Sequence, residues 1–149
     1  MLGAAVPAYA AYDLPYVGDQ KTYIANTDDT LVHIARRYGL GFVEMRAANP
    51  SVDPWIPGEG VELVLPSRHL LPDVNHSGVV INLPEMRMYA FVNGDAPPTT
   101  FALGIGREGL ETPTGTTTVV RKMAGPTWRP TARMLREDPT LKPVVPPGP

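Results

Sequence analysis

The chain has 149 residues, with 13 Lys and Arg against 15 Asp and Glu, so its formal net charge is -2. This near-neutral balance argues against nucleic acid as the main partner, because phosphate binding needs a basic face. Hydrophobic residues make up 43% of a chain that contains no Cys, which predicts a globular protein of one or two small domains and excludes disulfides, thiolate metal sites and a Cys nucleophile.

Residues 1–20 have the features of a clipped export signal. Residues 1–11 are mainly small and apolar, and Ala8-Tyr9-Ala10 has the A-x-A form of a signal-peptidase site. A basic n-region and a full apolar h-region are missing, and no apolar run approaches the ~20 residues that span a bilayer. We interpret residues 1–20 as the remnant of an export signal and the mature N-terminus, and expect an exported protein of the periplasm or cell envelope. An ordinary disordered N-terminus is the alternative.

Residues 21–66 predict the order strand, helix, helix, strand. Residues 21–25 alternate polar and apolar side chains, and residues 26–29 supply a turn and the N-cap of a helix. This helix carries apolar residues at positions i, i+3, i+4 and i+7, and Gly39 ends it. The four apolar residues are Leu31, Ile34, Ala35 and Tyr38.

A second short helix is expected over residues 41–48, with Phe42, Met45 and Ala48 facing inward. It ends at Asn49-Pro50, since the residue before a Pro is pushed out of helical geometry. Residues 52–60 are expected to form a turn-rich loop. Residues 61–65 have an alternating pattern that predicts a closing strand.

The motifs of residues 29–66 resemble those of a LysM module. The shared elements are Asp29-Thr30-Leu31, Ile34-Ala35, Tyr38, Asn49-Pro50, Gly58 or Gly60, and Leu65-Pro66. One departure is Asp28, which stands where the family usually has Gly. The resemblance implies a βααβ fold that binds N-acetylglucosamine-containing glycans, such as peptidoglycan or chitin, in a shallow groove between the first loop and the loop after the second helix.

The candidate glycan-binding residues lie in these two loops. Short polar groups suit the N-acetyl amide and the hydroxyls of a sugar, and an apolar surface suits the face of its ring. Asp29 is either a glycan contact or only the helix cap, and Trp55 is either a stacking platform or a lid over a small core. The complete predicted set is Asp29, Thr30, Leu31, Asn49, Pro50, Trp55 and Ile56.

The pattern changes after residue 66. Residues 67–77 contain several turn-forming residues and are interpreted as a linker, while residues 78–149 are expected to be mainly β. The sequence predicts strands at 79–83, 87–92, 99–105 and 116–121, with Met88, Ala90 and Val92 on one face of the second and a hairpin turn at Asn93-Gly94. The expected fold class is therefore α+β, a small βααβ module followed by a mainly β domain.

A G-x-G-x-x-G pattern occurs at Gly104–Gly109, but it does not predict a nucleotide site. That motif needs a helix after its last Gly to hold the pyrophosphate. Pro113 and the β-rich residues after it argue against a helix at this position. We expect these glycines to allow tight turns and close backbone approach. None of the three His residues, His33, His69 and His76, has metal-ligand spacing, so neither a metal nor another cofactor is expected.

The second half resembles the front of a YkuD-type (ErfK/YbiS/YcfS/YnhG-like) L,D-transpeptidase catalytic domain. The matching runs are Ile81–Tyr89, Gly104-Ile105-Gly106, Thr112–Gly115 and Pro126-Thr127-Trp128. The resemblance implies a cysteine acyltransferase, in which a Cys attacks a peptidoglycan stem and an amine of a second stem, or of a lipoprotein, resolves the acyl-enzyme. The family's H-G and S-H-G-C-x-R signature is absent from this sequence, so no catalytic residue is assigned. We interpret residues 78–149 as an incomplete catalytic domain that is inactive and not independently stable.

These features together predict an exported peptidoglycan-binding protein that is a fragment of an L,D-transpeptidase. Its expected partners are the glycan and stem peptides of peptidoglycan. In this family a lipoprotein is the alternative acceptor of the acyl group. No nucleic acid partner is expected. The alternative is a non-enzymatic peptidoglycan-binding LysM protein with a shortened β interaction domain. Coding DNA that continues in frame past Pro149 into H-G and S-H-G-C would favour the fragment, and a stop codon would favour the binding protein.

Overall fold

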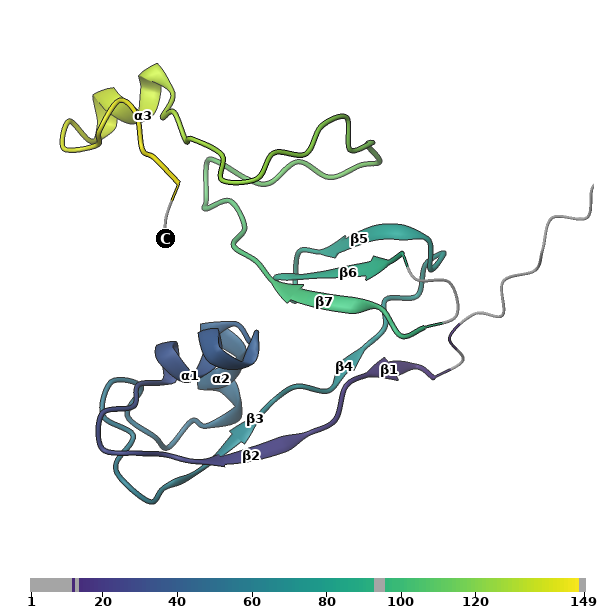
Figure 1. Cartoon of the computed structure of the whole chain (residues 1–149), viewed down its shortest axis with the longest axis vertical. Coiled ribbons are helices and arrows are strands. Elements are labelled where there is room, and N and C mark those ends of the chain that lie inside the picture. The colour runs from purple at the N-terminus through teal and green to yellow at the C-terminus, as the bar shows by residue number, and fades with distance from the viewer. Residues whose placement is uncertain (1–11, 13, 93–95, 148–149) are drawn as a thin grey trace, which may run out of the picture. The chain divides into compact units, whose positions relative to one another are not determined.

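The structure is a computed structural model that describes residues 12, 14–92 and 96–147. The A-x-A site at residues 8–10 and the hairpin turn at Asn93-Gly94 lie outside the described residues. The chain forms two compact units, residues 1–112 and residues 113–149, which are considered separately below (Figure 1). None of the helices in the described part of the chain is long and apolar enough to cross a membrane.

Residues 21–66 of the first unit form a module with the predicted βααβ order. Its elements are β2 (Lys21–Ile24), α1 (Leu31–Tyr38), α2 (Phe42–Ala48) and β3 (Glu62–Leu65). The two strands pair antiparallel, with Tyr23 opposite Leu63. The local apolar periodicity therefore predicted all four elements to within a residue or two. The residue range is called the βααβ module from here on.

The start of α1 differs from the prediction in one respect, because Thr30 and not Asp29 is the N-cap. The Thr30 hydroxyl accepts the backbone N–H of His33, which leaves Asp29 one position too early to cap the helix. The Asp29 carboxylate instead turns back to accept the Asn26 backbone N–H at 2.9 Å. At the other end Gly39 ends the helix as predicted, with a left-handed backbone (φ 67°) that places its N–H on the last carbonyls.

The core of the module is formed by side chains from both helices and both strands. Tyr38 and Phe42 were expected to face inward, but their side chains are 43% and 37% exposed. Tyr38 is the last residue of α1, and its ring packs edge-on against Tyr23 at 5.7 Å instead of entering the core. Ala48 is only half-buried. The buried apolar residues are Ala25, Leu31, Ile34, Ala35, Leu40, Met45, Leu63 and Leu65.

A short ribbon lies beside the module and was not predicted. It joins β1 (Tyr16–Val17) to β4 (His69–Leu70) in an antiparallel pair, so the segment before the module lies beside the segment after it (Figure 1). These two strands fall in the ranges interpreted as the N-terminus and the linker. At two residues each, they carry too little periodicity to be recognised from sequence.

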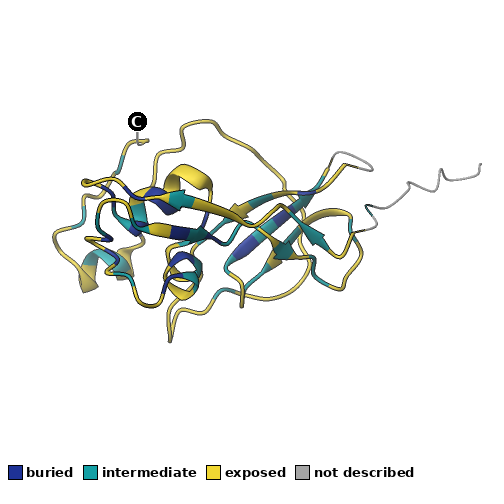
Figure 2. Cartoon of the chain, turned by 90° about the horizontal axis from the view of Figure 1, so that it is seen from below, coloured by how far each residue is buried: buried dark blue, intermediate teal, exposed yellow. Residues whose placement is uncertain are grey.

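Three strands follow as an antiparallel meander, β5 (Gly78–Asn82), β6 (Arg87–Phe91) and β7 (Thr99–Ala102), in the order β5-β6-β7. Their existence confirms the first three strands predicted for this half. The buried face of β6 is the one opposite to Met88, Ala90 and Val92. Val92 is 63% exposed, whereas Arg87 and Tyr89 on the opposite face are 1% and 0% exposed. Figure 2 shows how burial varies along the chain. The cause is that this opposite face contacts α2 and β4.

The Gly104–Gly109 segment is followed by irregular backbone and not by a helix. A Cβ at Gly106 would lie 2.0 Å from the carbonyl oxygen of Leu110, so only glycine fits there. The Gly106 N–H donates to the Thr112 hydroxyl at 2.7 Å. The expected close approach of backbone is confirmed, and the nucleotide interpretation stays excluded because its helix is missing.

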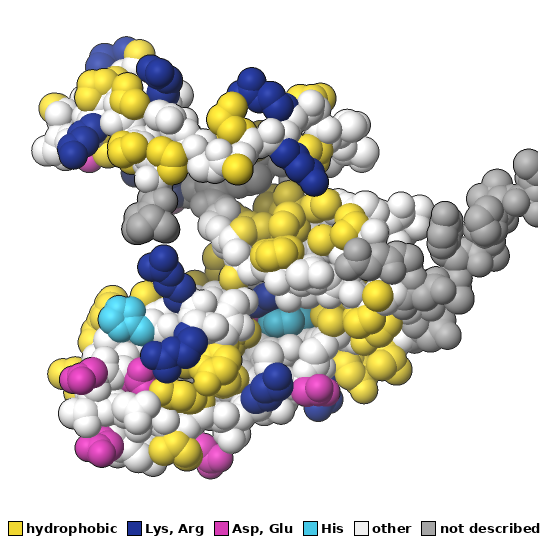
Figure 3. All heavy atoms as spheres, viewed as in Figure 1, with side chains coloured by type: hydrophobic (Ala, Val, Ile, Leu, Met, Phe, Trp, Pro, Cys, Tyr) yellow, Lys and Arg dark blue, Asp and Glu magenta, His cyan; other side chains and the backbone are white. Residues whose placement is uncertain are grey.

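The second unit contains one short helix among its described residues, α3 (Ala132–Glu137), which was not predicted. Thr131 caps it, and Arg133 pairs with Glu137 at 2.6 Å. The strand predicted at residues 116–121 does not form, and Val120 is 94% exposed. A strand exists only with a hydrogen-bonded neighbour, and no described residue pairs with this segment. Most charged side chains visible on this unit are Lys and Arg (Figure 3).

Candidate functional site

The two loops predicted to form a groove are in direct contact. The N–H of Leu31, at the start of α1, donates to the carbonyl oxygen of Pro54 in the loop after α2 at 2.9 Å. This bond fixes the loop against the first turn of the helix, beside Thr30. The predicted candidates from both loops are therefore held at one end of the module.

Asp29 acts inside its own loop. Its side chain is 8% exposed and accepts the Tyr23 hydroxyl at 2.7 Å as well as the Asn26 backbone N–H, with Arg37 3.8 Å away. These donors hold the pKa of the Asp29 carboxyl below its usual range, the Asn26 N–H being the largest cause. The carboxylate thus shapes the first loop from within and offers little surface to a ligand.

Asn49 and Leu31 are also turned inward. The Asn49 amide donates to the carbonyl oxygens of Met45 and Val64, each at 2.9 Å, and its oxygen accepts the Val64 N–H at 2.8 Å. Both of its N–H groups are therefore used to tie the end of α2 to β3. Leu31 is fully buried in the core. The geometry gives these two predicted site residues a supporting role.

Trp55 and Ile56 form the exposed part of the predicted set, with 62% and 74% of their surface accessible. Asp53 holds the turn that presents them, because one carboxylate oxygen accepts the N–H of Trp55 at 2.8 Å and of Ile56 at 3.0 Å. The same bonds hold the pKa of Asp53 below its usual range. A tryptophan this exposed does not cover the core, so the structure argues against the lid interpretation.

Phe42 joins this surface although sequence reasoning placed it in the core. Its ring stacks on that of Trp55, with centroids 6.0 Å apart and planes 30° from parallel. The two rings, called the aromatic pair below, give an apolar platform, and the exposed Ile56 follows Trp55 in the same loop. Hydrophobic side chains also alternate with acidic ones on the loop end of the module (Figure 3). An aromatic at the first turn of a short helix, opposite a Trp-bearing loop, was the signal that could have identified Phe42.

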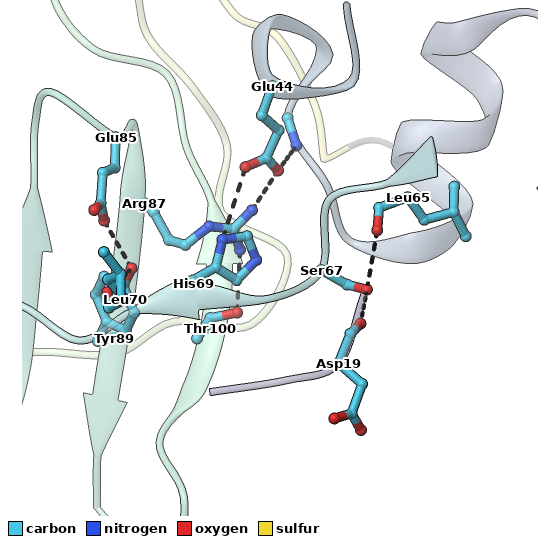
Figure 4. A network of polar contacts seen from close by, with 11 residues as sticks. Asp19, Glu44, Leu65, Ser67, His69, Leu70, Glu85, Arg87, Tyr89 and Thr100 are labelled. Atoms are coloured by element: carbon cyan, nitrogen blue, oxygen red, sulfur yellow. Dashed lines mark hydrogen bonds and ion pairs between the residues drawn. The ribbon is translucent and has the colours of Figure 1, made fainter. Parts of the chain in front are cut away.

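A second group of polar side chains joins the module to the sheet and was missed entirely from sequence (Figure 4). Arg87 of β6 is 1% exposed and pairs with the Glu44 carboxylate of α2. It also donates to the Thr100 hydroxyl at 3.0 Å, while its Nε is buried without a partner. Glu44 in addition accepts the backbone N–H of Gly41, the N-cap of its own helix, so it contacts the helix start and the sheet together.

His69 and Tyr89 complete this group, which is called the junction network. The Tyr89 hydroxyl lies 2.7 Å from a Glu85 carboxylate oxygen and 3.0 Å from the Leu70 carbonyl oxygen. Burial, and then the Glu85 carboxylate, raises the pKa of Tyr89. Burial and the nearby Arg87 lower the pKa of His69 to about 4, so its imidazole is neutral at neutral pH although Glu44 lies 4.0 Å away.

The remaining histidines show no arrangement suited to nucleophilic or metal chemistry. The His76 ring stacks on Phe91 at 4.5 Å, and its Nε2 lies 3.0 Å from the Pro72 carbonyl oxygen, so it is held in place beside Ser77 without a carboxylate to orient it. His33 is exposed on α1. In the described part of the chain no group of three His, Asp or Glu side chains comes together to hold a metal ion.

An open, mainly apolar cavity of about 410 Å³ lies between the module's helices and β7. Its walls come from α1, from the turn before α2 and from β7. Phe42 of the aromatic pair forms part of its lining, and Arg36 supplies its one charged side chain. The lining residues are Val32, Ala35, Arg36, Gly39, Leu40, Phe42, Thr100, Phe101 and Ala102.

Comparison with known families gives a match in the second half of the chain. Residues 76–148 match the L,D-transpeptidase catalytic domain, YkuD. This finding confirms the resemblance carried by Ile81–Tyr89 and the Gly104 to Trp128 motifs. The matched residues include β5, β6 and β7, and therefore Arg87 and Tyr89 of the junction network.

Curated relatives have the same family name. The chain is 41% identical over 139 residues to "Probable L,D-transpeptidase YcfS" of Escherichia coli (strain K12), a match that covers 89% of this chain and 43% of the relative. It is 44% identical over 124 residues to "Probable L,D-transpeptidase YbiS" of the same organism, covering 80% and 40%. A third relative, "Probable L,D-transpeptidase ErfK/SrfK" of Salmonella typhimurium, is 42% identical over 129 residues, covering 83% and 42%.

The chain thus spans about two fifths of the length of these L,D-transpeptidases. Because the matches cover 80% to 89% of the chain, the similarity extends in front of residue 76 into the βααβ module. The matches therefore take in parts of both the βααβ module and residues 76–148.

Proposed function

We propose that this chain is part of an exported L,D-transpeptidase that acts on peptidoglycan in the periplasm or cell envelope. The observation that carries the proposal is the match of residues 76–148 to the L,D-transpeptidase catalytic domain, supported by relatives at about 40% identity. In this proposal the βααβ module is a LysM-like glycan-binding module and residues 78–149 are an incomplete catalytic domain. The acceptor is an amine of a second stem peptide or of a lipoprotein.

The chemistry of this family, as implied by the resemblance, is acyl transfer through a Cys thiolate. That step needs a nucleophile, a base and an oxyanion hole. The 149 residues contain no Cys, and the H-G and S-H-G-C-x-R motifs do not occur among them. We therefore expect the 149-residue chain to bind peptidoglycan without catalysing transfer.

The aromatic pair supports the glycan-binding part of the proposal. An exposed aromatic ring can pack against the apolar face of a sugar ring, and Trp55 is both accessible and fixed in orientation by Phe42 and by the Asp53 turn. Thr30 stands at the adjoining helix start, where its hydroxyl accepts one N–H and keeps its own proton free to donate. In this proposal Pro50 and Ile56 extend the apolar surface of the groove. Asp29, Leu31 and Asn49, which are turned inward, stabilise the two loops.

Co-sedimentation with insoluble peptidoglycan tests this function. We expect the chain to be recovered in the pellet, and Trp55→Ala and Phe42→Ala to reduce the recovered fraction. Ile24→Ala, which removes an equally exposed apolar side chain from β2, is the matched control. Thr30→Ser keeps the helix cap and the hydroxyl, so it should bind like the parent. No recovery of the parent, or equal recovery of all variants, would contradict the proposal.

A further inference from the structure

The chain runs into and out of the βααβ module as one continuous ribbon. In β2–β3, Lys21 lies opposite Leu65, and in β1–β4, Val17 lies opposite His69. Three residues separate the two ladders on each strand, so the pairing resumes in the same register. Two β-strands that keep register across an interruption are held as a ribbon and not as a flexible pair of linkers.

The interruption itself is tightly packed. Gly18 has a left-handed backbone (φ 80°), and a Cβ at this position would lie 2.0 Å from the Ser67 carbonyl oxygen. The Ser67 hydroxyl donates to the Asp19 carbonyl oxygen on the facing strand (Figure 4). The two strands therefore touch through their backbones where the ladder is broken, and the segment interpreted from sequence as a linker is fixed on both sides.

The ribbon continues into contacts with the sheet. Beyond β4, the Leu71 N–H donates to the Pro15 carbonyl oxygen at 2.8 Å, and the Leu70 carbonyl oxygen lies 3.0 Å from the Tyr89 hydroxyl of β6. His69 lies beside Glu44 and Arg87. One face of β6 is thus covered by the ribbon and by α2, which explains why Arg87 and Tyr89 are its most buried residues.

The Glu44–Arg87 pair gives this packing a specific geometry. The guanidinium is removed from solvent, and its hydrogen bonds go to Glu44 of the module and Thr100 of the sheet. A buried ion pair adds little net stability over apolar packing, but it strongly disfavours arrangements in which either charge loses its partner. Sliding or turning the module on the sheet would separate the Arg87 guanidinium from Glu44, and its Nε already lacks a hydrogen-bond partner.

From these contacts we propose that the βααβ module and the β5–β6–β7 sheet move as one rigid body, with Arg87 as the positioning residue that sets the module's orientation. Resting on the proposed function, this means that the glycan surface at Trp55 faces a fixed direction relative to the transpeptidase segment. The module then orients one strand of the polymer with respect to the catalytic domain, which a flexible tether would not do. A tether raises only the local concentration of substrate.

Distances between two spin labels test the proposal directly. The sequence has no Cys, so labels can be attached to Arg46→Cys on α2 and Val79→Cys on β5, both at exposed positions, with no competing thiol. Pulsed electron paramagnetic resonance on the full 149-residue chain should give one narrow distance distribution. A broad distribution in the otherwise unchanged chain would overturn the rigid body.

Substitutions at the ion pair test the role of Arg87. Glu44→Gln removes the charge partner while keeping a side-chain oxygen that can accept the Gly41 N–H at the start of α2. We expect this variant to lose the single narrow distance. Arg87→Lys keeps the charge but loses the planar fork, and we expect a distribution between those of the parent and Glu44→Gln. The control is Glu62→Gln, which removes an exposed carboxylate from β3 of the same module and should leave the distance unchanged.

Circular dichroism of each variant checks that it is folded. If Arg87→Lys does not fold, Glu44→Gln still tests the role of the ion pair. A distribution that stays narrow in Glu44→Gln would show that Arg87 does not set the orientation. Peptidoglycan co-sedimentation of the same proteins separates the two proposals. Narrow distances without binding would contradict the glycan function alone, whereas binding with a broad parent distribution would contradict the rigid body alone.

Discussion

Glu44 in α2 and Arg87 in β6 form an ion pair at the point where the module meets the sheet. The carboxylate also accepts the Gly41 N–H at the start of its own helix, so one side chain couples the start of α2 to the covered face of β6. Glu44 remains 23% accessible while the Arg87 side chain is 2% accessible. The cost of breaking the pair therefore falls mainly on the arginine, whose charge would be left in a buried site.

Two substitutions at Glu44 separate its contributions. Glu44→Gln should lower the free energy of unfolding by about 2 kcal/mol, because it leaves the Arg87 charge without a counter-ion. Glu44→Ala should cost about 1 kcal/mol more, since it also removes the acceptor for the Gly41 N–H. Urea denaturation of both variants and the parent measures the difference. Equal losses in the two variants would show that the hydrogen bond from the Gly41 N–H contributes nothing.

His69 predicts a pH dependence of stability. Its pKa is lowered from 6.5 to about 4 in the folded chain by burial and by Arg87. Between these two values the unfolded chain binds a proton that the folded chain does not, so the free energy of unfolding should fall as the pH drops from 6.5 towards 4. Because solvent still reaches part of the His69 ring and screens its charge, the loss attributable to it is on the order of 1 to 2 kcal/mol.

Denaturation measured at several pH values tests this assignment. His69→Gln removes the titrating group from the junction network and should flatten the slope between pH 6.5 and 4. His33→Gln is the control, because His33 is exposed on α1 and should leave the slope unchanged. If His69→Gln retained the slope of the parent, another group would have to carry the pH dependence.

Gly18 should be irreplaceable in the ribbon. Gly18→Ala would force a side chain into a left-handed backbone and into contact with the Ser67 carbonyl oxygen, so we expect a loss of about 3 kcal/mol or more. Gly60→Ala is a matched control, with a similar φ of 77° but no atom within 4 Å of the new Cβ. It should cost only about 1 kcal/mol, from backbone strain alone. Similar losses at both positions would show that the contact with Ser67 is easily relieved.

The sequence was sufficient for those elements whose signal is local. α1, α2, β2 and β3 each have their own apolar period, and Thr30, Gly39 and Pro50 mark helix ends within the same few residues. The ribbon was missed because a two-residue strand such as β1 is defined by its distant partner. Residues 116–121 show the reverse case, where high β-propensity does not form a strand without a neighbour to pair with.

The residues of the candidate glycan-binding site and of the junction network were predictable only in part, as were the secondary-structure elements. Trp55 and Ile56 were proposed because they lie in the loop that the LysM resemblance implies to be one wall of the groove, and the structure shows that both side chains are exposed. Phe42 was assigned to the core because helical periodicity cannot distinguish an inward position from one at the rim of a small module. Arg87 was overlooked because pattern analysis places a charged residue in solvent unless its partner is known, and Glu44 lies in another element.

The aromatic pair makes a prediction that can be measured with a single fluorophore. The sequence has two Trp residues, Trp55 in the module and Trp128 in the second unit, so Trp128→Phe leaves Trp55 as the only reporter. Soluble N-acetylglucosamine-containing fragments of peptidoglycan should shift the Trp55 emission to shorter wavelength, because a sugar packed on the ring would exclude water from a side chain that is 62% exposed.

In that background, removing the second ring tests whether the stack matters for binding. Phe42→Ala should weaken the affinity by about fivefold to tenfold, as expected for the loss of an aromatic pair worth about 1 kcal/mol. Phe42→Tyr keeps the stack and should bind like the parent. If Phe42→Ala bound equally well, Trp55 would act without its neighbour. An emission spectrum unchanged by saturating glycan, in a chain that still sediments with peptidoglycan, would place the binding surface elsewhere on the module.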